Sequence, residues 1–238
     1  MGATSKTRAV GRNVLRKEGR EKVTGAAKYV DDLEFRGMLH GRTVRSTIPR
    51  GEIARVRLGF NRDGFTVADW RDVPGRNTIA LIELDQPCLA EREVRHFAEP
   101  ILLLAHADRD RLIEADVSID YRPAEPVFDA ERSPHCFKEI AIAKGDLARG
   151  LEDADLVVEG EYRVGHQEQL YIETNGVIAV PENGGITVYG SLQCPYYVNR
   201  ALTVLLAMTP EKVRVVQAVT GGGFGDREEY PSRIVGHA

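Results

Sequence analysis

The sequence is poor in cysteine, and its few cysteines are scattered. Cys88, Cys136 and Cys194 are the only three, and no two of them form a Cys-x-x-Cys pair. This pattern excludes a cysteine-rich zinc site and a disulfide framework. It is typical of a protein that folds in a reducing compartment, so we expect a cytoplasmic location.

Long hydrophobic runs and a large charge excess are also missing. The longest apolar stretches, residues 100–105 and 201–208, fall far short of the ~20 residues that a membrane-spanning helix needs. Residues 1–22 are polar and lack the apolar core of a signal peptide. The chain carries 32 Lys and Arg against 36 Asp and Glu, whereas a general nucleic-acid-binding protein is usually strongly basic. We therefore expect neither a membrane nor a nucleic acid as partner.

What is present is the composition of an ordinary globular protein. Of 238 residues, 42% are hydrophobic and 29% are charged, which suffices for one or two domains with a core. In the first half, residues 23–27 are turn-like. Alternating or apolar segments there predict strands, and one helical pattern lies among them. The predicted strands cover residues 37–46, 55–60, 101–105 and 117–121, and the predicted helix covers 107–115. This mixture indicates an α+β unit.

The second half has clearer boundaries. Residues 122–144 carry three prolines, and we interpret them as a crossing between two units. Asp146 is expected to cap a short helix that runs to residue 151. The Asn183-Gly184 pair predicts a hairpin turn over residues 181–185, and Pro195 predicts the start of a helix that ends near Met208. Strands or extended runs are predicted at residues 156–164, 170–180, 186–190 and 212–219.

The C-terminal end of the sequence is abrupt. Pro231 is placed to begin another helix, yet the chain ends at Ala238 without the usual helix stop. One interpretation is a truncated larger protein, and the other is a short native turn capped by Gly236.

A glycine-rich loop is the strongest local signal. The predicted strand 212–219 is followed by Gly221-Gly222-Gly223-Phe224-Gly225. Glycines let backbone amides approach a ligand closely. The dinucleotide fingerprint fails because Asp226 stands at its last position, and no Gly-Lys-Ser/Thr of a phosphate loop follows. A ligand-binding loop and a tight turn without a ligand both fit.

Three side chains near this loop or near Pro195 could carry chemistry. Gln193 could donate a hydrogen bond to an oxygen in a cleft, or it could simply order its loop. Cys194 lacks an identifiable base and is interpreted as a half-buried spectator. Glu228 could contact a substrate, or it could be a solvated charge near a helix start. His166 and Glu168 lack the zinc-protease spacing, and a Gly-x-Ser-x-Gly elbow is absent.

Taken together, these motifs resemble the molybdenum-binding subunit of the xanthine dehydrogenase and aldehyde oxidase family. The matching segments, in the family's order, are residues 18–29, 37–41, 99–101, 145–160, 167–173, 193–195 and 221–228. The resemblance covers nearly the whole chain. It implies an α+β fold, with an α/β hammerhead domain followed by the first part of a molybdopterin-binding domain. The implied boundaries are a flexible start at 1–20, the hammerhead at 21–130 and the truncated molybdopterin-binding domain at 131–238.

The resemblance also implies a site. Gln193 would hydrogen-bond an oxygen of the molybdenum centre, and Gly223, Phe224 and Gly225 would place backbone beside it. Glu228 would touch substrate, which favours a purine or another N-heterocycle over an aldehyde. Asp226, Arg227 and Ala98 depart from the family, which commonly has Gly, Lys and Gly at these positions.

The family's catalytic base, a glutamate, would lie beyond Ala238, so no catalytic residue is assigned. The resemblance implies an oxidoreductase that takes oxygen from water, is incomplete and inactive as this isolated chain, and works with the remainder of the subunit. Its cofactor would be molybdopterin, with the cytosine dinucleotide form as one option, and iron–sulfur and FAD groups would sit on partners. The alternatives are a non-catalytic remnant or binding module of the same fold without metal, and an unrelated α+β binding domain.

Overall fold

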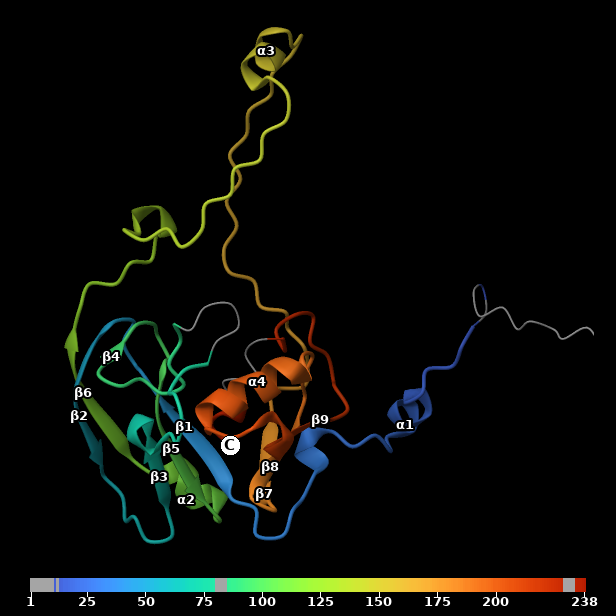
Figure 1. The fold of residues 1–238 in the computed structure, drawn as a ribbon. Coiled ribbons are helices and arrows are strands. Elements are labelled where there is room, and N and C mark those ends of the chain that lie inside the picture. The colour runs from blue at the N-terminus through green and yellow to red at the C-terminus, as the bar shows by residue number, and fades with distance from the viewer. Residues whose placement is uncertain (1–10, 12, 80–84, 229–233) are drawn as a thin grey trace, which may run out of the picture.

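A computed structural model of the chain describes residues 11, 13–79, 85–228 and 234–238 (Figure 1). The body consists of three three-stranded sheets. No helix in these ranges is long and apolar enough to cross a bilayer. The helix start predicted at Pro231 falls on residues outside the described ranges.

The first half of the chain forms two of the sheets, and each contains two of the four expected strands and one strand that was not predicted. β1 (His40–Arg45) and β3 (Thr66–Asp69) flank the central β5 (Pro100–His106), and all pairs are antiparallel. β5 is central because its run of Pro, Ile and Leu is buried on both faces. β2 (Gly51–Leu58) pairs with β4 (Glu93–Val94) and with β6 (Val117–Pro123).

The helices of this half are short and capped. α2 (Arg109–Glu114) begins after Asp108, whose carboxylate accepts from the backbone amides of Asp110 and Arg111 at 2.9 and 3.2 Å. The turn expected at residues 23–27 is instead the end of α1 (Gly19–Thr24). Gly25 caps that helix with a φ of 74°, a conformation that glycine adopts without strain. The single-turn helices are η1 (Val30–Asp32), η2 (Trp70–Asp72), η3 (Ala130–Arg132) and η4 (Pro210–Lys212).

The second half contributes the third sheet. β7 (Val177–Glu182) and β8 (Gly185–Gly190) form the predicted hairpin, in which Asn183 and Gly184 have φ values of 50° and 69°. α4 (Pro195–Leu205) then carries the chain to β9 (Val213–Gln217), which pairs with β8 in parallel. α4 follows the predicted start at Pro195, but it ends three residues before Met208.

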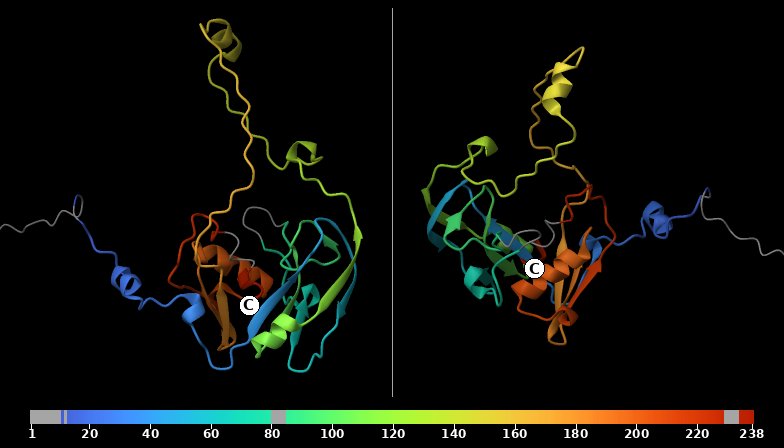
Figure 2. Two further views of the ribbon diagram at one scale, coloured as in Figure 1. Left: turned by 180° about the vertical axis from the view of Figure 1, so that it is seen from behind. Right: turned by 45° about the horizontal axis from the view of Figure 1, so that its top comes forward.

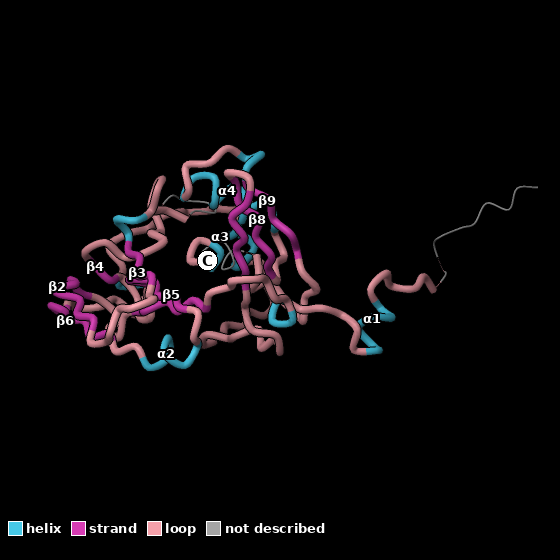
Figure 3. Tube along the Cα trace, turned by 90° about the horizontal axis from the view of Figure 1, so that it is seen from below, coloured by secondary structure: helices cyan, strands magenta, loops and turns pink. Residues whose placement is uncertain are grey.

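One hydrophobic core joins the two halves of the chain. We call it the shared core. From the first half it contains Ile79, Cys88 and Leu89, and from the second it contains Val188, Leu192, Val198, Ala201, Leu202, Leu205, Val213 and Val235. The partly buried Trp70 packs against it. Seen from below, the β8–β9 sheet lies beside the sheets of the first half, while α1 stands apart (Figure 3). The two halves therefore pack together into one folded body through this core.

A loop of the first half also covers the C-terminal end of α4. The backbone amides of Gly75 and Arg76 donate to the carbonyls of Leu205 and Val204 at 2.8 and 3.1 Å. The last carbonyls of a helix have no partner within the helix, so these two bonds satisfy groups that would otherwise be buried unpaired.

Residues 124–176 contain no strand. Residues 127–170, which are exposed throughout, project from the body as an extended arm (Figures 1 and 2). Near its tip lies α3 (Leu147–Glu152), which begins as predicted, with Asp146 accepting from the Arg149 amide at 3.0 Å. The strand predicted at residues 156–164 is wrong, and of the extended run 170–180 only the part within β7 is a strand. The alternation is present in the sequence, but a strand needs a neighbour for its backbone groups and this segment has none.

The arm leaves much apolar surface in water. Tyr162, Ile142 and Phe137 are each more than 90% exposed. The chain exposes 18431 Å² in all, whereas a compact monomer of this mass would expose about 10,600 Å². Large exposed apolar surfaces mark sites that another polypeptide covers, or sites of aggregation. We therefore expect the isolated chain to be poorly soluble.

Trypsin should cut the isolated chain first in the arm, for example at Lys138, Lys144 and Arg163. These residues are exposed and lie outside helices and strands, where proteases find accessible backbone. The products should still co-elute in native size-exclusion chromatography because the shared core contains residues from both sides of the cuts. Mass spectrometry identifies the sites, and separation of the products without denaturant would contradict a shared core.

Ala98 adopts a conformation that suits glycine. Its φ is 61°, in the left-handed region that costs an L-residue about 1–2 kcal/mol. Ala98→Gly should therefore raise the free energy of unfolding by about 0.5–1 kcal/mol, after allowance for the greater freedom of glycine in the unfolded chain. Urea unfolding measures the change. The matched control, Ala179→Gly in the extended strand β7, should be destabilising.

Candidate cofactor site

The topology of the third sheet brings Gln193 and the glycine loop together. β8 and β9 are parallel neighbours, so their carboxyl ends lie at the same edge of the sheet. Gln193 comes three residues after β8, and the loop that begins at Gly221 comes four residues after β9. Ligands of such sheets characteristically bind outside the carboxyl ends of the strands. The sequence predictions for Gln193 and the loop therefore fall on one site.

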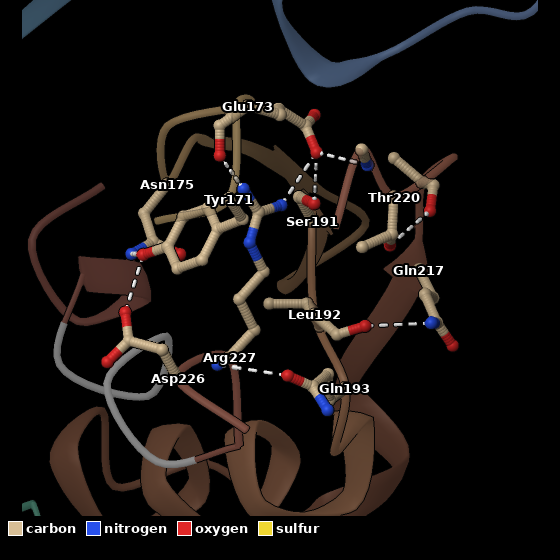
Figure 4. Close-up of polar contacts among 12 residues, drawn as sticks. Tyr171, Glu173, Asn175, Ser191, Leu192, Gln193, Gln217, Thr220, Asp226 and Arg227 are labelled. Atoms are coloured by element: carbon tan, nitrogen blue, oxygen red, sulfur yellow. Dashed lines mark hydrogen bonds and ion pairs between the residues drawn. The ribbon is translucent and has the colours of Figure 1, made fainter. Parts of the chain in front are cut away.

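The side chain of Gln193 has a fixed orientation. Its Oε1 atom accepts from the backbone amide of Arg227 at 3.2 Å (Figure 4). It also accepts from the backbone amide of Gly225 at 3.1 Å, and the backbone amide of Gln193 donates to the carbonyl of Arg227 at 2.8 Å. Gln193 is an exposed residue, and within the described ranges its Nε2 group has no hydrogen-bond acceptor, so Nε2 is the end of the carboxamide that is available to a ligand. Nε2 can only donate. Gln193 therefore offers a neutral donor to an oxygen atom of a ligand.

The glycine loop has a backbone that most residues could not adopt. Gly222 and Gly225 have φ values of 117° and 105°, and even Phe224 has a φ of 50°. A Cβ atom on Gly223 would lie 2.5 Å from Oε1 of Gln193. Within the described ranges, the backbone amides of Gly222, Gly223 and Phe224 have no hydrogen-bond acceptor. Amides left unpaired in such a loop are a common device for holding oxygen atoms of a ligand.

A buried polar cluster supports the loop from behind. Arg227 is fully buried, and its guanidinium lies over the ring of Tyr171, 4.5 Å from the centroid. Glu173 pairs with Arg227 at 2.7 Å, and Tyr171 donates to Asp226 at 2.5 Å (Figure 4). Burial and the Asp226 carboxylate raise the pKa of Tyr171, so its hydroxyl stays a donor. No role for Tyr171, Glu173 or Arg227 was predicted, because an arginine in a glycine-rich loop looks like a surface charge.

Cys194 and Glu228 flank the site. Cys194 is partly buried, and Glu228 is exposed on the last turn of the loop. Burial, and secondarily the negative charge of Glu228, raise the pKa of the Cys194 thiol. A reactive cysteine needs the opposite shift, which agrees with the interpretation of Cys194 as a spectator.

Alkylation of Cys194 by iodoacetamide should therefore require a higher pH than alkylation of a free thiol. A raised pKa leaves less thiolate at neutral pH, and the rate increases only as the pH approaches that pKa. Peptide mass spectrometry follows Cys194, with the exposed Cys136 as an internal standard for the reagent. Glu228→Gln should move the pH dependence of the alkylation rate to lower pH, by less than the shift that burial causes, because the charge of Glu228 is the second cause. Alkylation of Cys194 at a lower pH than a free thiol would contradict the raised pKa.

The donor set suits the oxygen atoms of a cofactor. Among the described residues, no group of three or more His, Cys, Asp or Glu side chains could ligate a metal. What the site offers is the Nε2 group of Gln193 and three loop amides that have no acceptor within the described ranges. The missing side chain of Gly223 leaves room for the Gln193 carboxamide, because a Cβ atom there would meet its Oε1 atom. Fixed neutral donors of this kind stabilise negative charge on oxygen without reorganising. These residues therefore fit a group that brings its own oxygen ligands, such as a molybdenum–pterin cofactor.

Comparison with known proteins agrees with the fold. Residues 24–125 match the model of the aldehyde oxidase and xanthine dehydrogenase a/b hammerhead domain, and residues 128–236 match that of the molybdopterin cofactor-binding domain. The fold is thus an α/β hammerhead followed by molybdopterin-binding sequence. The chain belongs to the xanthine dehydrogenase and aldehyde oxidase family and corresponds to the N-terminal portion of its molybdenum-binding subunit.

Two relatives show how much of such a subunit the chain spans. It is 33% identical to the nicotinate dehydrogenase large molybdopterin subunit of Eubacterium barkeri, with 92% of this chain and 55% of that protein aligned. It is 33% identical to a probable xanthine dehydrogenase subunit of Bacillus subtilis (strain 168), with 90% and 31% aligned. The chain therefore spans between about a third and about half of these relatives. Their names do not favour a non-catalytic remnant.

Solved structures agree at the level of the fold. Quinoline 2-oxidoreductase from Pseudomonas putida 86 superposes with a TM-score of 0.81 over 97% of this chain and 33% of that one. Aldehyde oxidoreductase from Desulfovibrio gigas superposes with a TM-score of 0.76 over 92% and 28%. Both are 21% identical, so the likeness concerns the fold alone.

Proposed function

We propose that the chain provides one wall of the cofactor site of a molybdenum hydroxylase that oxidises an N-heterocycle, of the purine or pyridine type, with water as the oxygen source. The observation that carries the proposal is the fixed carboxamide of Gln193. Its carbonyl oxygen accepts from two loop amides, which leaves its Nε2 group available to donate to a ligand. The N-heterocycles in the names of nicotinate dehydrogenase and xanthine dehydrogenase support this substrate class over an aldehyde.

Each predicted site residue has a role in this proposal. Gln193 donates to an oxygen atom of the cofactor, and Gly223, Phe224 and Gly225 hold backbone against it. The cofactor, when bound, supplies the two-electron redox chemistry. Glu228 is exposed beside this wall, and its carboxylate is an acceptor for a ring N–H of the substrate. The glutamate base belongs to sequence outside this chain, so we propose that the chain alone is inactive.

The remaining assignments follow from the family. We propose molybdopterin in either its simple or its cytosine dinucleotide form. Iron–sulfur and FAD groups on partner subunits or domains would accept the electrons, and the assembly would work in the cytoplasm. Domain boundaries are proposed near residues 20 and 130. The apolar arm supports the need for more polypeptide, because its side chains have no cover within the described part of the chain.

Metal analysis and substrate oxidation test the proposal in the complete assembled protein. We expect molybdenum and a fluorescent pterin in about equal amount to this chain. Turnover of purines, pyridine carboxylates and aromatic aldehydes is compared in isotopically labelled water. Label in a hydroxylated heterocycle is the expected result, and faster turnover of aldehydes would overturn the substrate class. A folded, fully assembled protein without molybdenum would overturn the function itself.

A further inference from the structure

A single carboxylate holds both ends of the glycine loop. At the start of the loop, the backbone amide of Gly221 donates to Oε2 of Glu173 at 2.6 Å. At its end, Nη1 of Arg227 donates to the same oxygen at 2.7 Å. Ser191 donates to this oxygen as well, at 2.8 Å, and thereby ties it to the end of β8 (Figure 4). The loop is therefore closed by side chains at its base, outside the segment that carries the unpaired amides.

Arg227 is more buried, and makes more contacts, than a typical surface arginine. Its side chain has no exposed surface, while that of Glu173 retains 18%. Nη2 donates to the backbone carbonyl of Glu173, and the planar guanidinium stacks on Tyr171. Nε is buried without a partner within the described ranges. An unpaired buried N–H group costs free energy, and a buried ion pair by itself is weak evidence for stability. The function of Arg227 is therefore inferred from the geometry of its contacts.

The main chain of the same residue orients Gln193. The amide of Arg227 donates to Oε1 of Gln193, and its carbonyl accepts from the backbone amide of Gln193. A displacement of Arg227 would therefore move the carboxamide whose free Nε2 group is directed outward. The contacts form one continuous path from Glu173 through the guanidinium to the backbone and to Gln193.

We propose that Arg227 is a positioning residue, and that its guanidinium, clasped by Glu173, holds the glycine loop and Gln193 in the arrangement that receives the cofactor. The inference rests on the proposed function for the identity of the ligand. The positioning of the loop does not depend on it, because the clasp, the contacts of Glu173 with Gly221 and Arg227, is formed by residues of this chain alone. Lysine could reach the carboxylate, but it has no planar group that contacts the carboxylate and the backbone carbonyl of Glu173 while stacking on Tyr171, so the guanidinium of arginine is required.

Hydrogen–deuterium exchange and cofactor content in the complete protein test the proposal. Arg227→Gln should make the hydrogen-bonded amides of Gly221 and Gly225 exchange about tenfold faster, because charge-assisted hydrogen bonds at the loop base are lost. Molybdenum retained after gel filtration should fall by about tenfold or more, as when a supporting partner of a metal site is removed. Arg227→Lys should lie between Arg227→Gln and the unchanged protein in both measurements.

The matched control is Ser191→Ala. It removes one partner of the same Glu173 oxygen from a buried position but touches neither end of the loop. It should lower the melting temperature while leaving loop exchange and molybdenum within about twofold of the unchanged protein. If Arg227→Gln does not fold, Glu173→Gln gives the same comparison, because it keeps the shape of the side chain and removes the charge.

The outcomes distinguish the positioning role of Arg227 from the proposed function of the protein. Unchanged exchange at the amides of Gly221 and Gly225 in the Arg227 and Glu173 variants would overturn the positioning role. The same rise in Ser191→Ala would also overturn it, by showing general loosening instead. If the unchanged protein holds no molybdenum, the proposed function fails, while the exchange comparison still decides whether the clasp exists.

Discussion

Gly75→Ala is expected to lower the free energy of unfolding by about 2–4 kcal/mol, the largest effect on stability that the structure predicts. A Cβ atom there would lie 2.2 Å from the carbonyl oxygen of Val204 and 2.8 Å from both the amide of Ala207 and the carbonyl oxygen of Leu205. All three atoms are backbone, so no side chain can rotate away. The loop must leave the end of α4, and its two hydrogen bonds to the helix are lost with it.

Urea unfolding followed by tryptophan fluorescence measures this loss. Trp70 is the only tryptophan, and it packs against the shared core close to the substituted loop. Gly41→Ala is the matched control, because a Cβ atom at this position of β1 would meet nothing within 4 Å. It should change stability by less than about 0.5 kcal/mol. If both variants unfold at the same urea concentration, the loop of the first half does not support α4.

The elements that sequence reasoning predicted correctly are those with a local physical cause. β5 follows from an apolar run, the β7–β8 hairpin from Asn183-Gly184, and α4 from Pro195 with apolar residues at helical spacing. Each of these causes acts within about ten residues of chain, so it can be recognised without knowledge of the neighbours.

The errors arose where the outcome depends on a distant partner. The alternating pattern at residues 156–164 says which face would be buried, but it cannot say whether another strand is present. The shared core likewise joins Leu89 to Leu202 over more than a hundred residues of chain. No periodicity in either segment indicates the other.

The sequence predicted Gln193 and the glycine loop as parts of one site, but it did not indicate which residues hold them in place. The glycines and Gln193 were identified from the motif and the resemblance, and the parallel pairing of β8 and β9 explains why they meet. Glu173 and Arg227 were missed because each looks like an ordinary charged residue in the sequence. Their structural role becomes visible only in the structure. Arg227 is fully buried and Glu173 mostly so, and both ends of the loop bind the same oxygen of the Glu173 carboxylate.

Gly223→Ala should reduce molybdenum content of the complete protein by about 10- to 100-fold while lowering stability only by about 1–2 kcal/mol. The φ of Gly223 is one that alanine tolerates, and the atom in the way of its new Cβ is Oε1 of Gln193, at 2.5 Å. That atom is the end of a flexible side chain, so the protein can relieve the clash by turning the carboxamide away. The relief breaks the bonds to the amides of Gly225 and Arg227, and it misdirects the Nε2 donor.

A double-mutant cycle shows whether this is the cause. Gln193→Ala removes the obstructing side chain together with the donor, so it should reduce molybdenum about as much as Gly223→Ala does. Combining the two substitutions should then cause little further loss of molybdenum, and stability should be less than additively affected, because the clash no longer exists. Elemental analysis and urea unfolding of the four proteins supply both cycles. Fully additive losses of molybdenum would mean that Gly223 acts on the cofactor independently of Gln193. The orientation of the Gln193 carboxamide by the loop would then not explain the effect of Gly223→Ala.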